Sequence, residues 1–230
     1  MNRVADGSVV HERADSHASL DQGRAASRTK WIIPLGVTGL YLAWALAVQL
    51  RMLDSLDMAV RRATQTGVVW GPDQIRAARV VHWLQPAHLA LPLLLLVAVL
   101  SLVRCSLRPL VVTAVVGVPV IGVTLGTKWV MAHTETNATP VSHGSFPSGH
   151  TVTVIVVVGL AVLLLRPGTR WGWILPALLG FVIGSALLIA WVHPATDVIG
   201  AGLLAVAALT GAQAAGLGEW ARLRQTRSDR

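Results

Sequence analysis

Six long apolar segments, separated by short polar stretches, constrain the fold of this chain more than any other feature of its sequence. They cover residues 31–50, 86–103, 110–131, 152–165, 173–192 and 198–217. A helix needs about 20 apolar residues to cross a hydrocarbon core of about 30 Å, and the segments are close to that length. The sequence therefore predicts an all-α polytopic membrane protein, built as a six-transmembrane-helix bundle.

The composition agrees with lipid as the solvent of this chain. Of its 230 residues, 53% are hydrophobic and only 13% are charged, which is too apolar for an ordinary soluble domain. The net charge of +8 comes from cations scattered singly between the apolar segments, so it does not indicate a nucleic-acid partner. Cys105 is the only cysteine, which excludes an internal disulfide and a multi-cysteine metal site.

The polar segments divide the chain into three parts. Residues 1–30 have mixed charge and no apolar period, which predicts a disordered cytoplasmic tail. This lead-in is too long for a cleaved signal peptide, the alternative for the first apolar segment. Residues 31–217 form the predicted membrane domain, and residues 218–230 a basic cytoplasmic tail. Within the outer segment 51–85, apolar residues at helical spacing over Leu53–Val60 predict a short interfacial helix.

The distribution of cations predicts the orientation. With the N-terminus inside, thirteen Lys and Arg face the cytoplasm and six face outside, namely Arg51, Arg61, Arg62, Arg76, Arg79 and Lys128. Cytoplasmic loops carry the excess of Lys and Arg in membrane proteins. We therefore expect a multi-pass protein of the cell membrane with both termini in the cytoplasm.

Polar residues at the outer ends of the predicted helices are the strongest functional signal. They are Lys128 near the end of the third helix, Ser148, Gly149 and His150 at the start of the fourth, and His193 and Asp197 around the turn between the fifth and the sixth. All fall at one depth, although they are distant in sequence. Ionisable residues at membrane depth are costly and are functional candidates. The sequence therefore predicts a site at the extracytoplasmic face.

Each of these residues also has a purely structural interpretation when it is taken alone. Lys128 can be a lysine that extends its amine toward the interface from a helix end. Ser148 can be a simple N-cap after a proline turn. Asp197 can merely complement the dipole of the last helix. Their conjunction favours a functional site, while no role is assigned to the lone histidines His82, His88 and His133.

Three short segments carry a family resemblance. KWVMAHT, SFPSGHT and HPATD, all within Lys128–Gly202, resemble the three signatures of the type 2 phosphatidic acid phosphatase superfamily. This superfamily includes bacterial membrane lipid phosphatases and soluble vanadium haloperoxidases. The resemblance implies a phosphatase that uses a histidine nucleophile, needs neither metal nor cofactor, and has a lipid phosphate substrate and the membrane lipids as its partners.

The histidines fit this chemistry. Neutral His193 would attack phosphorus and form a phosphohistidine. Asp197, four residues on, can accept a hydrogen bond from the other ring nitrogen and so fix the tautomer. His150 would protonate the leaving alkoxide and then activate water.

The phosphate would be held at the start of the fourth predicted helix. The hydroxyl of Ser148 and the amides around Gly149 and His150 face the positive end of a helix dipole, which is a natural anion site. Lys128 would neutralise a phosphate oxygen as a mobile point charge.

The chain departs from the superfamily pattern at two positions. The first signature has an arginine seven residues after the lysine, where this chain has Glu135; the third has one six residues before the histidine, where this chain has Leu187. A hydrogen bond to a charged group contributes about 1.5–3 kcal/mol, so the loss of two costs about 3–6 kcal/mol, or roughly a hundred- to ten-thousandfold in rate. Arginines that can reach in from the outer segment are Arg51, Arg61, Arg62, Arg76 and Arg79.

Two functions follow from these observations. The first is a membrane phosphatase that hydrolyses a lipid phosphate or pyrophosphate monoester through a phosphohistidine. The alternative is a catalytically impaired relative that acts as a lipid-phosphate-binding or scaffold membrane protein. The six spans disfavour a haloperoxidase-like use of vanadate, and the lack of an acidic relay disfavours a transporter. The sequence indicates neither the lipid headgroup nor the oligomeric state.

Overall fold

Each of the six apolar segments forms a helix. The computed structural model describes residues 8–64, 70–131, 145–166 and 170–223, and in these residues all regular structure is helical. The six helices are α1 (Ser8–Gln49), α4 (Pro86–Val103), α5 (Arg108–Met131), α6 (Gly149–Leu165), α7 (Ile174–Ile189) and α8 (Ala195–Ala214). The all-α prediction is confirmed.

Most of these helices are long and apolar enough to cross a membrane. Four stretches meet that criterion, namely Thr29–Gln49, Pro72–Val103, Arg108–Met131 and Ala195–Ala214. Helices α6 and α7 are equally apolar but have 17 and 16 residues, slightly fewer than the roughly 20 that a straight crossing needs. The helices therefore have the composition of a multi-pass membrane protein, and the count of six crossings stays a prediction.

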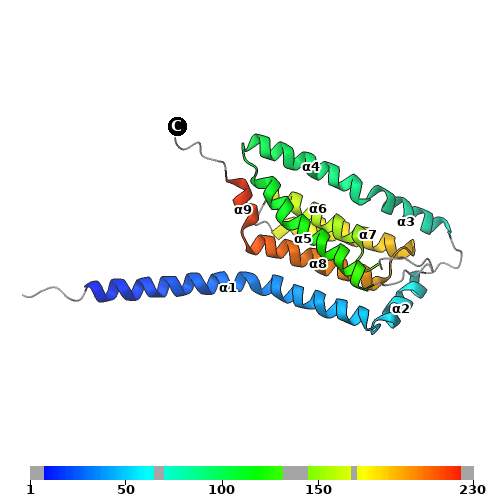
Figure 1. The fold of residues 1–230 in the computed structure, drawn as a ribbon, viewed down its shortest axis with the longest axis horizontal. Helices are drawn as coiled ribbons and strands as arrows, with labels where there is room; N and C mark the ends of the chain where they lie inside the picture. Colours follow the sequence, from blue (N-terminus) through cyan, green and yellow to red (C-terminus); the bar gives the residue numbers. More distant parts are fainter. Residues whose placement is uncertain (1–7, 65–69, 132–144, 167–169, 224–230) are drawn as a thin grey trace, which may run out of the picture.

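The helices pack side by side, with α6 at the centre of the bundle. Helix α6 contacts α4, α7 and α8, while the C-terminal half of α1 lies along α8 (Figure 1). Gly159 of α6 has no room for a side chain, because Leu209 of α8 fills the space beside it. This close approach of α6 and α8 matters for the site, because both helices begin at the same end of the bundle.

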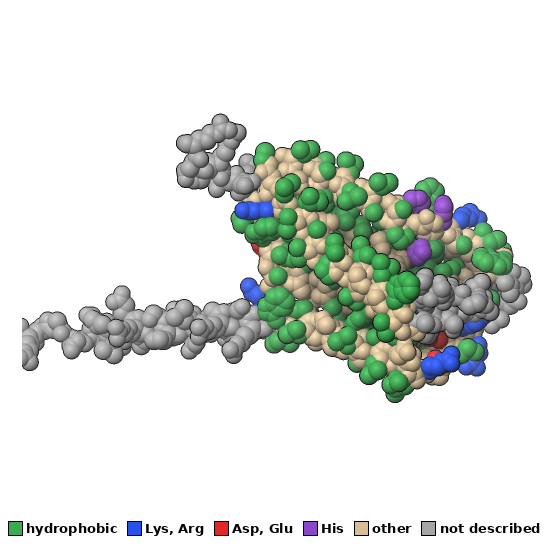
Figure 2. Space-filling view, viewed as in Figure 1, with side chains coloured by type: hydrophobic (Ala, Val, Ile, Leu, Met, Phe, Trp, Pro, Cys, Tyr) green, Lys and Arg blue, Asp and Glu red, His purple; other side chains and the backbone are tan. Residues whose placement is uncertain are grey.

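The outer surface of the bundle is apolar. Hydrophobic side chains cover its middle, while Lys and Arg gather toward its two ends (Figure 2). Large residues such as Val130 and Phe181 are 79% and 73% exposed. Burying a large apolar side chain is favourable by about 1.5–3 kcal/mol, so a surface of this kind is stable only where lipid tails replace water.

The N-terminal segment differs from the prediction. Helix α1 begins at Ser8, not at the expected Trp31, so residues 8–30 are helical where a disordered tail was predicted. The segment contains no proline and one glycine, and it continues an apolar helix whose first turns are already formed. Adding a residue to an existing helix costs far less than starting one, which explains the extension. Residues 1–7 lie outside the described residues.

Two further segments are more ordered than predicted. The outer segment 51–85 holds two helices, α2 (Asp54–Thr64) and α3 (Pro72–Trp83), where a single interfacial helix was expected. The predicted C-terminal tail begins with a short helix, α9 (Leu217–Arg222), and residues 224–230 lie outside the described residues.

Two arginines fix α9 against the bundle. Arg104 donates to the carbonyl oxygens of Ala221 and Leu164, both at 3.1 Å, and Arg108 donates to that of Leu223 at 3.1 Å. The last carbonyls of a helix lack intrahelical partners, and a guanidinium provides several donors for them. Arginines that the sequence presented only as flanking charges therefore hold α9 in place.

Candidate active site

The start of α6 forms a compact turn around Ser148. Its Oγ accepts hydrogen bonds from the backbone N–H of Thr151 at 3.4 Å and from the Thr151 hydroxyl at 3.2 Å. Ser148 is therefore the N-cap of α6, as its structural interpretation predicted. A hydroxyl that accepts two bonds keeps its own O–H as a donor, so the cap can also bind an anion.

The turn is attached to α8. The N–H of Ser148 donates to the carbonyl oxygen of Asp197 at 3.1 Å. The ring of Phe146 is fully buried and stacks on Tyr41 of α1, with 6.2 Å between the ring centres. A side chain at Gly200 of α8 would overlap the Phe146 ring, so only glycine fits there. The loop before α6 and the first turn of α8 therefore form one packed unit.

His193 and Asp197 form a buried pair at the start of α8. The Nδ1 atom of His193 lies 3.0 Å from Oδ2 of Asp197, and the two side chains are 7% and 0% exposed. Trp191 has a φ of +58°, which turns the chain sharply after α7 and brings His193 over the first turn of α8. A carboxylate at Nδ1 favours a proton on that nitrogen and leaves the Nε2 lone pair available.

Lys128, Gly149 and His150 complete the predicted set. Lys128, near the end of α5, donates to the carbonyl oxygen of Ser145 at 2.6 Å. Burial lowers the pKa of His150 below its ordinary value, and the nearby His193 and Lys128 lower it further. Among the described residues, no atom lies within 4 Å of the position that a Cβ of Gly149 would take, so the space beside this backbone is open.

Two residues from the first half of the chain join the site, and sequence reasoning missed both. The carboxylate of Asp57, on α2, accepts from the N–H of Thr196 at 2.9 Å and from its hydroxyl at 2.8 Å. Trp44, on α1, donates its indole N–H to the carbonyl oxygen of Thr196 at 3.1 Å. Asp57 caps α8 in place of Pro194, which has no polar side chain. The partners lie 139 and 152 residues apart, so no local sequence pattern could reveal them.

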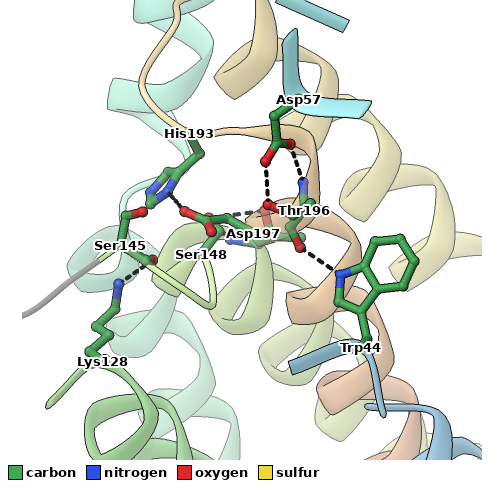
Figure 3. A network of polar contacts seen from close by, with 9 residues as sticks. Trp44, Asp57, Lys128, Ser145, Ser148, His193, Thr196 and Asp197 are labelled. Carbon is green, nitrogen blue, oxygen red and sulfur yellow. Dashed lines mark hydrogen bonds and ion pairs between the residues drawn. The ribbon is translucent and has the colours of Figure 1, made fainter. Parts of the chain in front are cut away.

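The predicted site residues meet at one end of the bundle. Figure 3 shows Lys128, Ser148, His193 and Asp197 around a common space at the ends of α5, α6 and α8. Leu187, where the third signature has arginine, is fully buried in an apolar cluster with Val154 and Ile183. Glu135 and His133 lie outside the described residues. The arrangement places an imidazole–carboxylate pair beside Lys128 and the backbone N–H groups at the start of α6.

The sequence of this region matches a known family. Residues 111–215 match the model of the PAP2 superfamily. The PAP2 segment comprises all but the first three residues of α5, together with α6, α7 and α8, and it contains all six predicted site residues.

A solved structure has a similar fold. The chain resembles the crystal structure of a transmembrane PAP2-type phosphatidylglycerolphosphate phosphatase from Bacillus subtilis, with a TM-score of 0.65 and 19% sequence identity. The alignment covers 85% of this chain and 99% of that structure, so the likeness extends beyond the PAP2 segment to the whole helical frame. No curated protein sequence matches this chain.

Proposed function

We propose that this protein is a membrane phosphatase that hydrolyses a lipid phosphate or pyrophosphate monoester. The observation that carries the proposal is the buried His193–Asp197 pair, which lies beside the anion site at the start of α6. The PAP2 match supports phosphatase chemistry at the level of the superfamily. The apolar helices around the site are typical of a protein embedded in the bilayer, where a lipid substrate is found.

In the proposed reaction the two histidines have different roles. Nε2 of His193 attacks phosphorus, and the bond from phosphorus to the leaving oxygen breaks as the phosphohistidine forms. His150, in its protonated form, gives its proton to the leaving alkoxide. The same residue, now neutral, removes a proton from water, which attacks phosphorus and releases inorganic phosphate and free His193. Asp197 stabilises the positive charge that develops on His193 during the attack.

The phosphate oxygens bind to donors that the fold already holds in place. The Ser148 hydroxyl and the backbone N–H groups lie at the N-terminus of α6, which is the positive end of the helix dipole. Lys128 donates to the carbonyl oxygen of Ser145, and its positive charge can neutralise a phosphate oxygen at this place. These groups bind without reorganisation, which is the main source of electrostatic stabilisation in enzymes.

We further propose that the site faces outward and that both termini are cytoplasmic. The site lies at the end of the bundle where α1 and α5 end and α6 and α8 begin. The opposite end carries the flanking cations of the predicted cytoplasmic segments, such as Lys30, Arg104, Arg108 and Arg166. An excess of cations next to helix ends marks the cytoplasmic side.

A second candidate function is supported by one observation. The apolar burial of Leu187 means that this position provides no cation to a phosphate, in contrast to the superfamily signature. A protein with a weakened phosphate site can bind a lipid phosphate without turning it over. The alternative proposal is therefore a lipid-phosphate-binding or scaffold protein.

Phosphate release by purified protein in detergent tests the proposed function. The substrates are phosphatidate, phosphatidylglycerol phosphate and polyprenyl pyrophosphate, each with a metal chelator present, and His193→Ala is the control. We expect release by the wild type and none by the variant, and a phosphohistidine trapped by rapid acid quench. Thermal protection by the lipids without turnover would favour the binding protein instead. Equal release by wild type and His193→Ala would refute the histidine mechanism.

A further inference from the structure

The absence of arginine from both signature positions leaves the phosphate site short of cationic donors. We propose that Arg61, on α2, binds the phosphate group of the substrate and replaces the signature arginines. The inference rests on the proposed function, because it assigns a further substrate-binding residue to the same site. It places a guanidinium on an element outside the PAP2 segment.

Helix α2 is held directly over the start of α8. The two hydrogen bonds from Thr196 to the Asp57 carboxylate, at 2.9 and 2.8 Å, join the backbone and the side chain of α8 to α2. Thr196 is next to Asp197, the partner of His193. The bonds between Thr196 and Asp57 therefore hold one face of α2 close to the His193–Asp197 pair.

Arg61 lies one turn further along the same face of α2. Residues four apart on a helix are neighbours on its surface, so Arg61 is directed to the side on which Asp57 binds α8. Its guanidinium carbon lies 5.6 Å from the centre of the Trp191 ring, within the range of a cation–π contact. Trp191 in turn is two residues before His193, so this contact holds the guanidinium near the nucleophile.

Arg61 and His193 line the same cavity. This cavity has a volume of about 10 Å³, close to the minimum for one water molecule, and its wall also includes Asp57, Trp191 and Pro194. A cavity of this size has room for a phosphate oxygen, not for a whole phosphate group. In the proposed arrangement Arg61 therefore contacts a phosphate group on His193 from the side of α2.

The other arginines of the outer segment do not line this cavity. Arg51 and Arg76 form ion pairs with Asp54 and Asp73, each within one turn of the same segment. Arg62 is exposed and donates to the carbonyl of Met58, and Arg79 is exposed on α3. Arg61 is only half exposed and alone among these five lines the cavity at His193. A guanidinium binds phosphate in a bidentate manner, which a lysine cannot reproduce.

The matched pair Arg61→Gln and Arg62→Gln tests the inference, because both remove one positive charge from α2. Full-length protein in detergent is assayed with the lipid phosphates named above and with inorganic phosphate as a competitive inhibitor. We expect kcat/KM to fall by about ten- to a hundredfold in Arg61→Gln, with a similar rise in the Ki for phosphate, and no change in Arg62→Gln. Arg61→Lys should recover only part of the loss, since it keeps the charge but not the fork geometry.

Thermal unfolding separates binding from a structural role. If Arg61 only packs on Trp191, Arg61→Gln lowers the unfolding temperature but leaves the Ki for inorganic phosphate unchanged, and the inference is refuted. An active wild type with equal kcat/KM in both variants also refutes it, while the proposed function stands. If no lipid is hydrolysed even by wild type, the proposed function fails. The inference about Arg61 is then tested by the rise in unfolding temperature that inorganic phosphate causes. Loss of that rise in Arg61→Gln alone supports the inference, and its retention refutes it.

Discussion

The two ends of the helix bundle use the same kind of bond for different purposes. At the site end, side chains from α1, α2 and α5 bind backbone atoms of the segments that carry the predicted chemistry. Asp57 and Trp44 bind Thr196 next to Asp197, and Lys128 binds Ser145 before the turn of α6. These bonds determine where ionisable groups lie.

At the opposite end, guanidinium groups bind backbone atoms that carry no chemistry. Arg104 binds the carbonyls of Leu164 and Ala221, and Arg108 binds that of Leu223 and packs on Trp220, with 5.4 Å from its guanidinium carbon to the ring centre. They satisfy the last carbonyls of α6 and α9 and close the bundle. Changes at this end should therefore alter stability alone, whereas changes at the site end should alter turnover, and four predictions test this difference.

The largest effect is expected at Asp197. Asp197→Asn keeps the shape of the side chain but removes the charge that, in the proposed mechanism, stabilises the positive charge developing on His193 during its attack, so kcat should fall by about four orders of magnitude. The unfolding temperature should fall much less than kcat, because the amide has the same shape and keeps an oxygen that can accept from Nδ1 of His193. Steady-state phosphate release and differential scanning fluorimetry measure the two quantities. A fall in kcat of less than tenfold would mean that the His193–Asp197 pair is only structural.

The opposite end should show the reverse behaviour. Arg104→Gln removes two charge-assisted bonds to α6 and α9, and the free energy of unfolding should fall by about 1.5–3 kcal/mol. Turnover should be unchanged at temperatures where the variant is folded. Denaturant unfolding in detergent gives the first quantity, with the exposed Arg79→Gln as control. A selective loss of turnover without a loss of stability would contradict the division between the two ends.

A smaller effect is expected where α8 contacts the loop before α6. Gly200→Ala forces a methyl group into the Phe146 ring, and overpacking of this kind costs about 1–3 kcal/mol. The matched control is Gly202→Ala on the same helix, because no described atom lies within 4 Å of the new methyl group there. Only Gly200→Ala should also lower kcat, because it displaces the loop that carries Ser148. Equal stabilities of the two variants would show that the loop moves freely.

The smallest effect concerns the pH dependence of stability. The pKa of His150 is lowered in the folded protein, so the unfolded chain binds more protons at this residue between the two pKa values. The contribution of His150 to stability is complete above its pKa in the unfolded chain, about 6.5, and is lost as the pH falls toward its lower pKa in the folded protein. The unfolding temperature should therefore fall more from about pH 8 to about pH 5 in wild type than in His150→Gln. If the unfolding temperature changed equally with pH in wild type and in His150→Gln, the prediction would be wrong. The exposed His88→Gln serves as control.

Much of the fold could be predicted from the sequence, because the bilayer imposes a simple length and composition on each helix. The six apolar segments, from the first near Trp31 to the last before Leu217, all form helices. The ends of the chain were predicted less well. Helix α9 depends on Arg104 and Arg108, which lie more than 110 residues away, and such tertiary bonds leave no local pattern.

In the candidate site, too, some residues could be predicted from a local sequence pattern and others could not. Lys128, Ser148 and His193 could be selected because polar groups next to apolar segments need a reason to be there. Asp57 and Trp44 could not, because one stood in an amphipathic segment full of charges and the other inside an apolar run. Arg61 was one of five equivalent cations in the sequence. Only the placement of α2 over Thr196 distinguishes it from its neighbours.

The backbone hydrogen bond from Ser148 to Asp197 affects how the site responds to a change in bilayer thickness. When a bilayer thins or thickens, its helices tilt and slide to match the hydrocarbon layer. The segments that carry the two histidines are fastened to each other by this bond and by the Phe146 ring against Gly200. The two segments should therefore move together, and the spacing between His150 and His193 should be preserved when lipid composition or temperature alters the thickness of the bilayer.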